Sequence, residues 1–237
     1  MSLFGIYPLE SLELDEDGIK IELRRNENVL SYIRQTENET AEKIISSDGN
    51  LVVNPVEPVN LPSCVTNYLL IELKKNVVIA PKAEAAIFVK FPVEVGVFVS
   101  GSGDIELVDV FSLARQKYTL YGDPRNGIVC RYWKSDVYQS IPDLEPLREG
   151  LMKLEIRNGF DEWVEVSRCV LDVYLMKIFY SDELVFSNVK MDIESKSTAE
   201  TRFVMEPLNR NMRKAVEIFT PRKVRIASKR FFMEWGL

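Results

Sequence analysis

The fold class is indicated by residues 151–166, which read Leu151-Met152-Lys153-Leu154-Glu155-Ile156-Arg157-Asn158-Gly159-Phe160-Asp161-Glu162-Trp163-Val164-Glu165-Val166. Apolar and polar residues alternate on both sides of Asn158-Gly159, which is the period of a β-strand with one buried face. Asn-Gly is a strong signal for a tight hairpin turn, because both residues tolerate positive φ angles. The stretch therefore predicts two antiparallel strands joined by a hairpin.

The same pattern recurs toward the N-terminus. Residues 19–23 and 29–33 alternate apolar and polar side chains around a polar break, and we expect a hairpin there. Residues 43–45 and 51–53 flank Ser46-Ser47-Asp48-Gly49-Asn50, whose Asp-Gly pair predicts another hairpin turn. Strand signals therefore dominate the chain.

Longer apolar runs occupy residues 68–99, with little alternation between polar and apolar positions. Such β-branched runs are typical of strands that are buried on both faces or that lie between two packed sheets. They predict the core of the first half of the protein. Further strands are expected at residues 105–110, 175–180, 184–193 and 201–205.

No clean periodicity is found in residues 135–150, which contain Pro142, Pro146 and Gly150. We place a domain boundary there, so that residues 1–140 form an N-terminal β-sandwich-like domain and residues 141–237 a C-terminal one. The fold is expected to be all-β, with immunoglobulin-like or jelly-roll-like sandwiches and few or no long helices. Residues 212–219 fit both a helix and a strand, and both readings stay open.

Composition excludes several kinds of catalysis. The chain has 237 residues, is 46% hydrophobic and 28% charged, and contains no histidine. The Ser-His-Asp triad, the Cys-His dyad and histidine-bearing zinc sites are therefore ruled out. Paired carboxylates could still act, but no pair stands out by its spacing. We predict no catalytic residues, no metal site and no cofactor, and an enzyme is the least favoured class.

The net charge of −6 is unevenly distributed. Nine basic and three acidic residues lie between Arg202 and Leu237, so this end carries +6 and residues 1–201 carry −12. The last part, residues 222–237, mixes basic residues with Phe231, Phe232 and Trp235. Such a segment could contact nucleic acid, but a final strand that seals a sandwich with its aromatic side chains is the favoured interpretation. Docking of the basic end on the acidic body of another copy makes self-association, or a protein partner, an expectation.

A cytosolic location is expected. No basic and apolar leader opens the chain, and no run approaches the length of about 18 apolar residues that a membrane span needs. Cys64, Cys130 and Cys169 are far apart, so they predict reduced core residues rather than disulfides. The acidic stretch at residues 15–18 is interpreted as a solvated turn.

The densest cluster of polar and aromatic residues is Lys117-Tyr118-Thr119-Leu120-Tyr121-Gly122-Asp123-Pro124-Arg125-Asn126-Gly127-Ile128-Val129-Cys130-Arg131-Tyr132-Trp133-Lys134. Guanidinium groups on and beside such a loop bind carboxylates or phosphates, and aromatic rings add stacking faces. A candidate site for a small anionic ligand or a carbohydrate consists of Tyr121, Arg125, Arg131, Tyr132 and Trp133. The alternative is a plain hairpin whose aromatic side chains pack inward.

With this cluster, the opening Phe4-Gly5-Ile6-Tyr7 and the run Phe88-Val89-Lys90-Phe91-Pro92-Val93-Glu94-Val95-Gly96-Val97, the chain resembles an archaeal protein family of unknown function. The resemblance implies a cytoplasmic archaeal protein and transfers no activity and no site residues. The residues themselves favour a non-catalytic binding or assembly module, with ligand binding at residues 121–134 or nucleic-acid contact through the C-terminal segment as alternatives.

Overall fold

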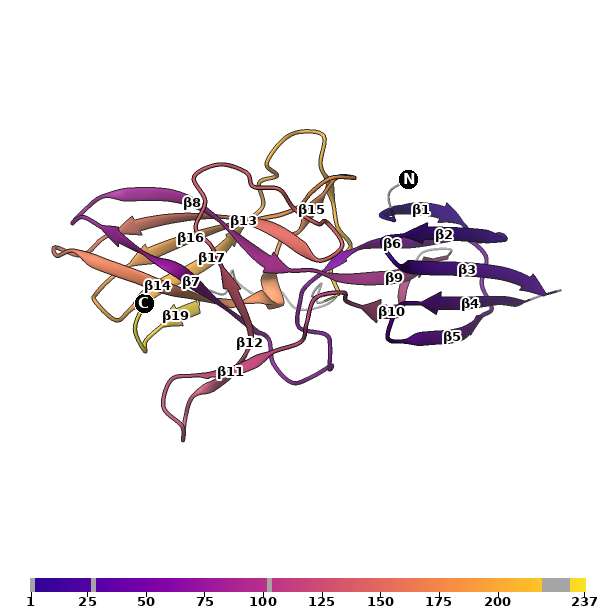
Figure 1. The fold of residues 1–237 in the computed structure, drawn as a ribbon, viewed down its shortest axis with the longest axis horizontal. Coiled ribbons are helices and arrows are strands. Elements are labelled where there is room, and N and C mark those ends of the chain that lie inside the picture. Colours follow the sequence, from indigo (N-terminus) through magenta and orange to yellow (C-terminus); the bar gives the residue numbers. More distant parts are fainter. Residues whose placement is uncertain (1–2, 27–28, 102–103, 219–230) are drawn as a thin grey trace. The chain divides into compact units, whose positions relative to one another are not determined.

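The computed structural model describes residues 3–26, 29–101, 104–218 and 231–237, and these residues form an all-β protein (Figure 1). The strands are β1 (Gly5–Pro8), β2 (Leu12–Glu16), β3 (Ile19–Asn26), β4 (Val29–Gln35), β5 (Thr40–Ile45), β6 (Asn50–Val56), β7 (Tyr68–Ile79), β8 (Glu84–Pro92), β9 (Glu94–Ser100), β10 (Ile105–Phe111), β11 (Tyr118–Tyr121), β12 (Ile128–Ser135), β13 (Glu149–Asn158), β14 (Val164–Asp172), β15 (Phe179–Tyr180), β16 (Val185–Ile193), β17 (Ala199–Val204), β18 (Arg213–Lys214) and β19 (Phe231–Met233). A short 3-10 helix, η1, spans Val173–Leu175. The predicted all-β class is confirmed. Within the described residues, no helix has the length and apolar character needed to span a bilayer.

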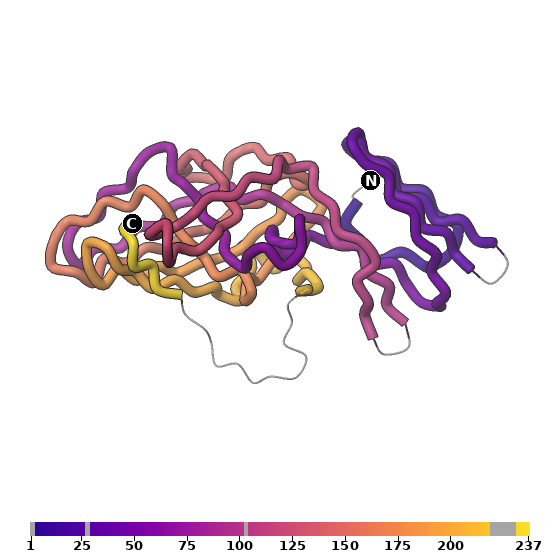
Figure 2. The backbone as a smooth tube through the Cα atoms, turned by 90° about the horizontal axis from the view of Figure 1, so that it is seen from below, coloured from indigo at the N-terminus to yellow at the C-terminus, as the bar shows by residue number. Residues whose placement is uncertain are grey.

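The chain divides into two compact units. Unit 1 consists of Met1–Pro55 and Val95–Phe111, and unit 2 of Val56–Glu94 and Ser112–Leu237, so the backbone passes between them three times (Figure 2). This division differs from the expected one at residues 135–150. Strand β13 pairs with β8 along its whole length, and residues on both sides of the predicted boundary therefore share a sheet of unit 2.

Unit 1 contains two four-stranded sheets, with the strand orders β1-β6-β9-β10 and β2-β3-β4-β5. Burial alternates along β3 and β4, as the period-2 pattern predicts, and the expected hairpin between these strands is confirmed. Tyr32 and Arg34 on β4 both bond to Asp109 on β10 and so link the two sheets. The two sheets therefore face each other, which is consistent with a sandwich.

Unit 2 also contains two sheets. The smaller has the order β11-β12-β7-β14, and the larger contains β18-β15-β16-β13-β8, with β17 added beside β16 and β19 beside β17. Both sheets contain a parallel pair, β7 with β12 and β13 with β16. Thr201 on β17 donates a hydrogen bond to the Val170 carbonyl on β14, which connects the sheets along one side.

The hairpin predicted at Asn158-Gly159 is wrong. Strand β13 belongs to the larger sheet and β14 to the smaller one, so the connection is an arch between sheets. The fully buried Asn158 amide holds the arch, because its Nδ2 donates to the carbonyls of Ile79, Ala80 and Glu162 at 3.2, 3.1 and 2.8 Å. An asparagine in this position satisfies three backbone carbonyls that an interstrand ladder would otherwise pair.

The hairpin predicted at Asp48-Gly49 is also wrong, since β5 pairs with β4 and β6 pairs with β1 in the other sheet. Gly49 has a φ of 133°, and a Cβ atom there would lie 1.9 Å from the Ser100 carbonyl oxygen. The glycine is therefore required for a close backbone approach. A two-residue hairpin turn is found instead at Asp17-Gly18, with φ angles of 50° and 79°. The solvated turn expected at residues 15–18 is therefore confirmed for its second half, whereas Asp15 and Glu16 end β2.

Three smaller expectations also need correction. Residues 212–218 form neither a helix nor a long strand, apart from the two-residue β18. The strand expected at residues 175–180 shortens to β15, after η1. Cys130 and Cys169 are buried as predicted, whereas Cys64 is exposed.

The C-terminal residues 231–237 pack onto unit 2. Strand β19 pairs with β17, and the rings of Phe231 and Tyr68 lie 5.0 Å apart. Ser167 donates a hydrogen bond of 2.7 Å to the Leu237 carbonyl. The predicted final strand is therefore present, but of its aromatic side chains only Phe231 packs inward, since Phe232 and Trp235 are exposed. The basic residues Arg222, Lys223, Arg225, Lys229 and Arg230, on which nucleic-acid contact and docking on an acidic body depend, lie outside the described residues.

Candidate functional site

The β11–β12 hairpin carries the predicted site residues. A loop from Gly122 to Gly127 joins the strands, and the Asp123 carboxylate accepts a hydrogen bond of 2.8 Å from the Arg125 backbone N–H. A Cβ atom on Gly127 would lie 2.6 Å from the carbonyl oxygens of Asp123 and Tyr121, so only glycine closes this loop. The predicted hairpin is therefore present, and its loop conformation follows from its own residues.

The structure does not bring the five predicted residues to one place. Arg125 is exposed in the loop, whereas Arg131 is completely buried. Their guanidinium groups therefore do not face one ligand. Tyr132 and Trp133 are half-buried, and as consecutive residues of β12 they point to opposite faces of the sheet.

Tyr121 is 2% exposed and is occupied by the C-terminal segment. Its hydroxyl accepts a hydrogen bond of 3.1 Å from the Trp235 N–H and donates one of 3.3 Å to the Gly236 carbonyl. Burial raises the pKa of this hydroxyl, so it stays protonated at neutral pH. Tyr121 therefore anchors the chain end.

We expect Tyr121→Phe to weaken this anchor by about 1 kcal/mol, the usual net contribution of a hydrogen bond. Amide hydrogen exchange at Trp235 should become about fivefold faster, while exchange in β7 stays unchanged. Tyr174→Phe, a matched change elsewhere in unit 2, serves as the control. Equal protection of the Trp235 amide in all three proteins would contradict the anchoring role.

Tyr132 and Trp133 line a cavity of about 190 Å³ together with three basic residues. We name this site the basic groove, and its lining consists of Arg115, Lys117, Tyr132, Trp133 and Lys134. Strand β11 pairs with β12 only as far as Arg131, and the preceding segment carries Arg115 and Lys117 beside the rest of β12. The groove therefore forms where β12 extends past its shorter neighbour.

Charge in and beside the groove is mainly positive. Lys134 Nζ lies 2.7 Å from one Glu72 carboxylate oxygen, and the Tyr132 hydroxyl donates to the other at 3.0 Å. These two hydrogen bonds lower the pKa of Glu72, which therefore stays ionised and neutralises Lys134. Within the described part of the chain, Arg115 and Lys117 form no ion pair with an acidic residue. Two exposed cations are thus available to a ligand.

Arg131 is buried next to the groove and contacts the segment that carries Arg115. Its Nη2 donates to the Arg115 carbonyl at 3.3 Å, and its guanidinium lies 5.8 Å from the centre of the Tyr118 ring. Burial lowers the pKa of Arg131, and the nearby Glu94 opposes this shift. Arg131 therefore has a positioning role and does not contact solvent.

Glu94 is the second buried charge of this region. It is 0% exposed, and one of its carboxylate oxygens accepts a hydrogen bond of 2.9 Å from the Asn60 N–H. Burial raises its pKa to about 7 despite the hydrogen bonds from Asn60 and the attraction of Arg131. The carboxyl group therefore changes its charge near neutral pH while it holds the segment before β7.

The predicted set of five site residues lacks three residues that line the groove, Arg115, Lys117 and Lys134. Lys117 and Lys134 lie at the ends of the cluster quoted above, but period-2 alternation does not show which neighbouring segment lies beside a strand. Arg115 lies before β11, in a loop without a motif. Only the pairing of β11 with β12 places it beside Trp133.

The geometry gives little support for a cysteine nucleophile or a metal site. Burial raises the pKa of the Cys130 thiol to about 12, so this residue is a weak nucleophile. Across residues 3–26, 29–101, 104–218 and 231–237, no three His, Cys, Asp or Glu side chains are grouped so as to hold a metal ion.

Comparison with known proteins gives one match. A family model described as a protein of unknown function (DUF432) matches residues 3–234. No curated protein and no solved structure matches the chain. The match covers nearly the whole chain and agrees with the resemblance to an uncharacterised family. The protein therefore belongs to the DUF432 family of proteins of unknown function.

Proposed function

We propose that this protein is a non-catalytic binding module whose basic groove holds a small anionic ligand. One observation carries the proposal: three basic and two aromatic residues line the groove, and none of the described acidic residues does. Glu72 neutralises Lys134, so Arg115 and Lys117 are the charges that a bound anion would compensate. The overall charge of −6 makes such a local excess of positive charge distinctive.

The lining also defines the class of ligand. Exposed Arg115 and Lys117 supply donors for a phosphate or a carboxylate, and guanidinium groups bind such oxoanions in a bidentate manner. Tyr132 and Trp133 are consecutive on β12 and point to opposite faces of the sheet, so one of the two rings supplies a face on which a planar group stacks. A cavity of about 190 Å³ suits one ring with one anionic substituent. We therefore propose an aromatic phosphate or carboxylate as the ligand class.

Calorimetric titration with phenyl phosphate tests this proposal. We expect Arg115→Gln and Lys117→Gln each to weaken binding about fivefold, because an exposed charge at about 4 Å contributes about 1 kcal/mol. Inorganic phosphate should bind more weakly than phenyl phosphate because it cannot stack on an aromatic ring of the groove. Binding should also weaken as the salt concentration rises.

Lys75→Gln is the matched control, because Lys75 is an exposed lysine on β7 that does not line the groove. It should leave the affinity for phenyl phosphate unchanged. If all three variants bind like the natural protein, or if phenyl phosphate does not bind at millimolar concentration, the proposed function is wrong.

We also propose a cytoplasmic archaeal protein that associates with itself or with a protein partner. Cys64, Cys130 and Cys169 are free thiols, which suits a reducing compartment. The resemblance supports archaeal origin, and the uneven charge along the chain supports association. Sedimentation at two salt concentrations tests the association, since a charge-driven oligomer dissociates when salt is raised.

A further inference from the structure

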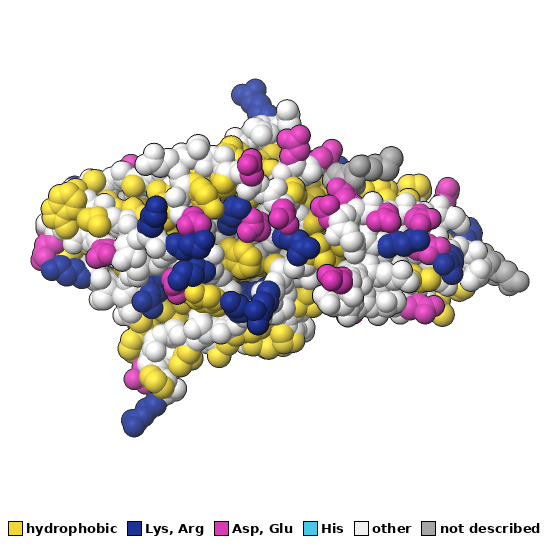
Figure 3. Space-filling view, viewed as in Figure 1, with side chains coloured by type: hydrophobic (Ala, Val, Ile, Leu, Met, Phe, Trp, Pro, Cys, Tyr) yellow, Lys and Arg dark blue, Asp and Glu magenta, His cyan; other side chains and the backbone are white. Residues whose placement is uncertain are grey.

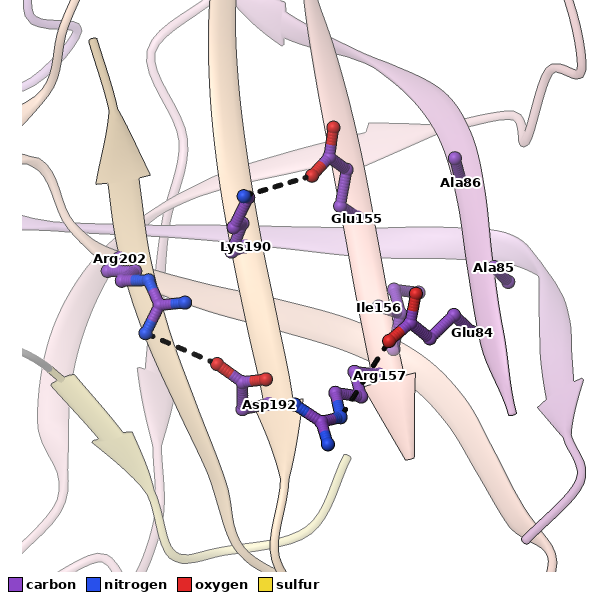
Figure 4. Close-up of a pocket in the computed structure, with 9 residues that line it drawn as sticks. All are labelled: Glu84, Ala85, Ala86, Glu155, Ile156, Arg157, Lys190, Asp192 and Arg202. Carbon is purple, nitrogen blue, oxygen red and sulfur yellow. Dashed lines mark ion pairs between the residues drawn. The ribbon is translucent and has the colours of Figure 1, made fainter. Parts of the chain in front are cut away.

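A second, separate hollow lies on the larger sheet of unit 2 (Figure 4). Its volume is about 450 Å³, and residues from β8, β13, β16 and β17 line it. The lining consists of Glu84, Ala85, Ala86, Glu155, Ile156, Arg157, Lys190, Asp192 and Arg202. None of these residues belongs to the basic groove, so the hollow is independent of the proposed function.

Strand register places the charged side chains of the hollow in two rows across the sheet. In the first row, Glu84 is opposite Arg157, and Arg157 is opposite Asp192, so the sign alternates from β8 to β16. On β17, the buried Glu200 lies opposite Asp192 and does not line the hollow. In the second row, Glu155 is opposite Lys190. The sign also alternates along β13 between Glu155 and Arg157. Opposite charges on neighbouring strands stabilise a sheet, and this face largely follows that rule.

Basic and acidic side chains also lie among one another over the face of the molecule in Figure 3. The second row departs from this arrangement at both of its ends. On β8, Ala86 lies opposite Glu155, at the position where a cation would continue the alternation. On β17, Arg202 lies opposite Lys190, so two like charges are neighbours. The row therefore has an unfilled cation position at one end and an excess of positive charge at the other.

The ion pairs across the hollow are long. Arg157 and Glu84 are separated by 3.7 Å, Lys190 and Glu155 by 3.6 Å, and Arg202 and Asp192 by 3.4 Å. A charge-assisted hydrogen bond between nitrogen and oxygen is typically about 2.7–2.9 Å long. These groups are therefore attracted to each other but keep donors and acceptors for a ligand. Glu155 is the most engaged, because Lys153 contacts its other oxygen at 2.5 Å.

We propose that this hollow binds an extended zwitterion, a short peptide with free termini. Its ammonium group would occupy the space above Ala86, near the carboxylates of Glu84 and Glu155. Its carboxylate would lie between Lys190 and Arg202 and remove their repulsion. The charge of the ligand therefore complements both irregular ends of the second row.

Strand spacing sets the length of the ligand. Neighbouring strands are about 4.8 Å apart, so the distance from β8 to a point between β16 and β17 is about 12 Å. An extended chain spans up to about 3.5 Å per residue, which gives about 10 Å for three residues. Flexible Lys190 and Arg202 side chains can close the remaining gap. A tripeptide is therefore the expected size.

Titration of the full chain with triglycine tests this proposal, with N-acetyl-triglycine amide as the uncharged counterpart. We expect saturable binding of triglycine and at least tenfold weaker binding of the blocked peptide. Glu155→Gln and Arg202→Gln should each weaken triglycine binding about fivefold, since each removes one charge partner. Chemical shift changes on titration should centre on Ala86 and Lys190.

Ala86→Lys gives a second test, because its ammonium group would fill the unoccupied cation position. We expect this variant to fold normally by circular dichroism and to lose triglycine binding at least tenfold. Glu183→Gln, an exposed change outside the hollow, and Lys117→Gln in the basic groove should bind triglycine like the natural protein. Equal binding of free and blocked peptides, or no effect of Ala86→Lys, would overturn the proposal and leave the basic groove unaffected.

Discussion

Replacing Asp109 by alanine is expected to lower the free energy of unfolding of unit 1 by about 3–5 kcal/mol. The Asp109 carboxylate lies 2.6 Å from Arg34 Nε and accepts a hydrogen bond of 2.9 Å from the Tyr32 hydroxyl. The Arg34 side chain is 1% exposed, and the side chain of Asp109 is 9% exposed. Removal of the carboxylate leaves a buried guanidinium without its main counter-charge, and this uncompensated charge is the source of the cost.

Amide hydrogen exchange in β4 and β10 measures this effect. The three tryptophans, Trp133, Trp163 and Trp235, all belong to unit 2, so their fluorescence does not follow unit 1 directly. Glu39→Ala is the matched control, because the Glu39 carboxylate also pairs with Arg34 but its side chain is 64% exposed. An exposed pair contributes about 0–1 kcal/mol.

A double variant, Arg34→Met with Asp109→Leu, should be more stable than Asp109→Ala, because it leaves no unpaired charge in the core. If Asp109→Ala costs no more than Glu39→Ala, the ion pair does not hold the two sheets of unit 1 together.

Glu94 is expected to make unit 2 less stable as the pH rises from about 4.5 to about 7. Burial raises the pKa of its carboxyl to about 7 from an ordinary value of 4.5. The folded state therefore binds this proton more tightly than the unfolded state. The stabilisation is complete below pH 4.5, decreases through this interval and is lost above pH 7. The pKa difference corresponds to about 3 kcal/mol.

Glu94→Gln resembles the protonated acid at every pH. We expect it to be more stable than the natural protein by about 3 kcal/mol at pH 8, with the difference disappearing near pH 4.5. Urea unfolding followed by tryptophan fluorescence measures this, since all three tryptophans lie in unit 2. Glu183→Gln, at an exposed position, should follow the pH profile of the natural protein. A constant difference between Glu94→Gln and the natural protein across this pH range would show that Glu94 does not titrate as expected.

The candidate site was predicted only in part. Tyr132 and Trp133 belong to the predicted set and line the groove. Arg131 shares the same local pattern, but the structure buries it completely, because β12 lies between β11 and β7 and has one face toward the interior. Tyr121 is covered by residues 235 and 236, more than 100 positions away in the chain. The residues next to Arg131 and Tyr121 in the sequence contain no pattern that predicts the burial of either side chain.

The turns also show that local sequence does not determine which strands pair. Asp17-Gly18 forms a two-residue hairpin turn, whereas Asn158-Gly159 and Asp48-Gly49 lead from one sheet to another. The residue types at the three turns are nearly the same. What differs is whether distant strands, such as β8 and β16 on either side of β13, offer better partners than the next strand along the chain.

The sequence by itself therefore determined the all-β class and where most strands form, because a period of two residues depends only on neighbours in the chain. It also excluded histidine chemistry, since the chain has no histidine. Only the tertiary structure decided which strands pair, including the parallel pairs β7 with β12 and β13 with β16. It also decided that Arg115 and Lys117 join Tyr132 and Trp133 in one groove. The reason is physical: strand pairing and burial depend on contacts between residues far apart in the chain, and these contacts override local turn preferences.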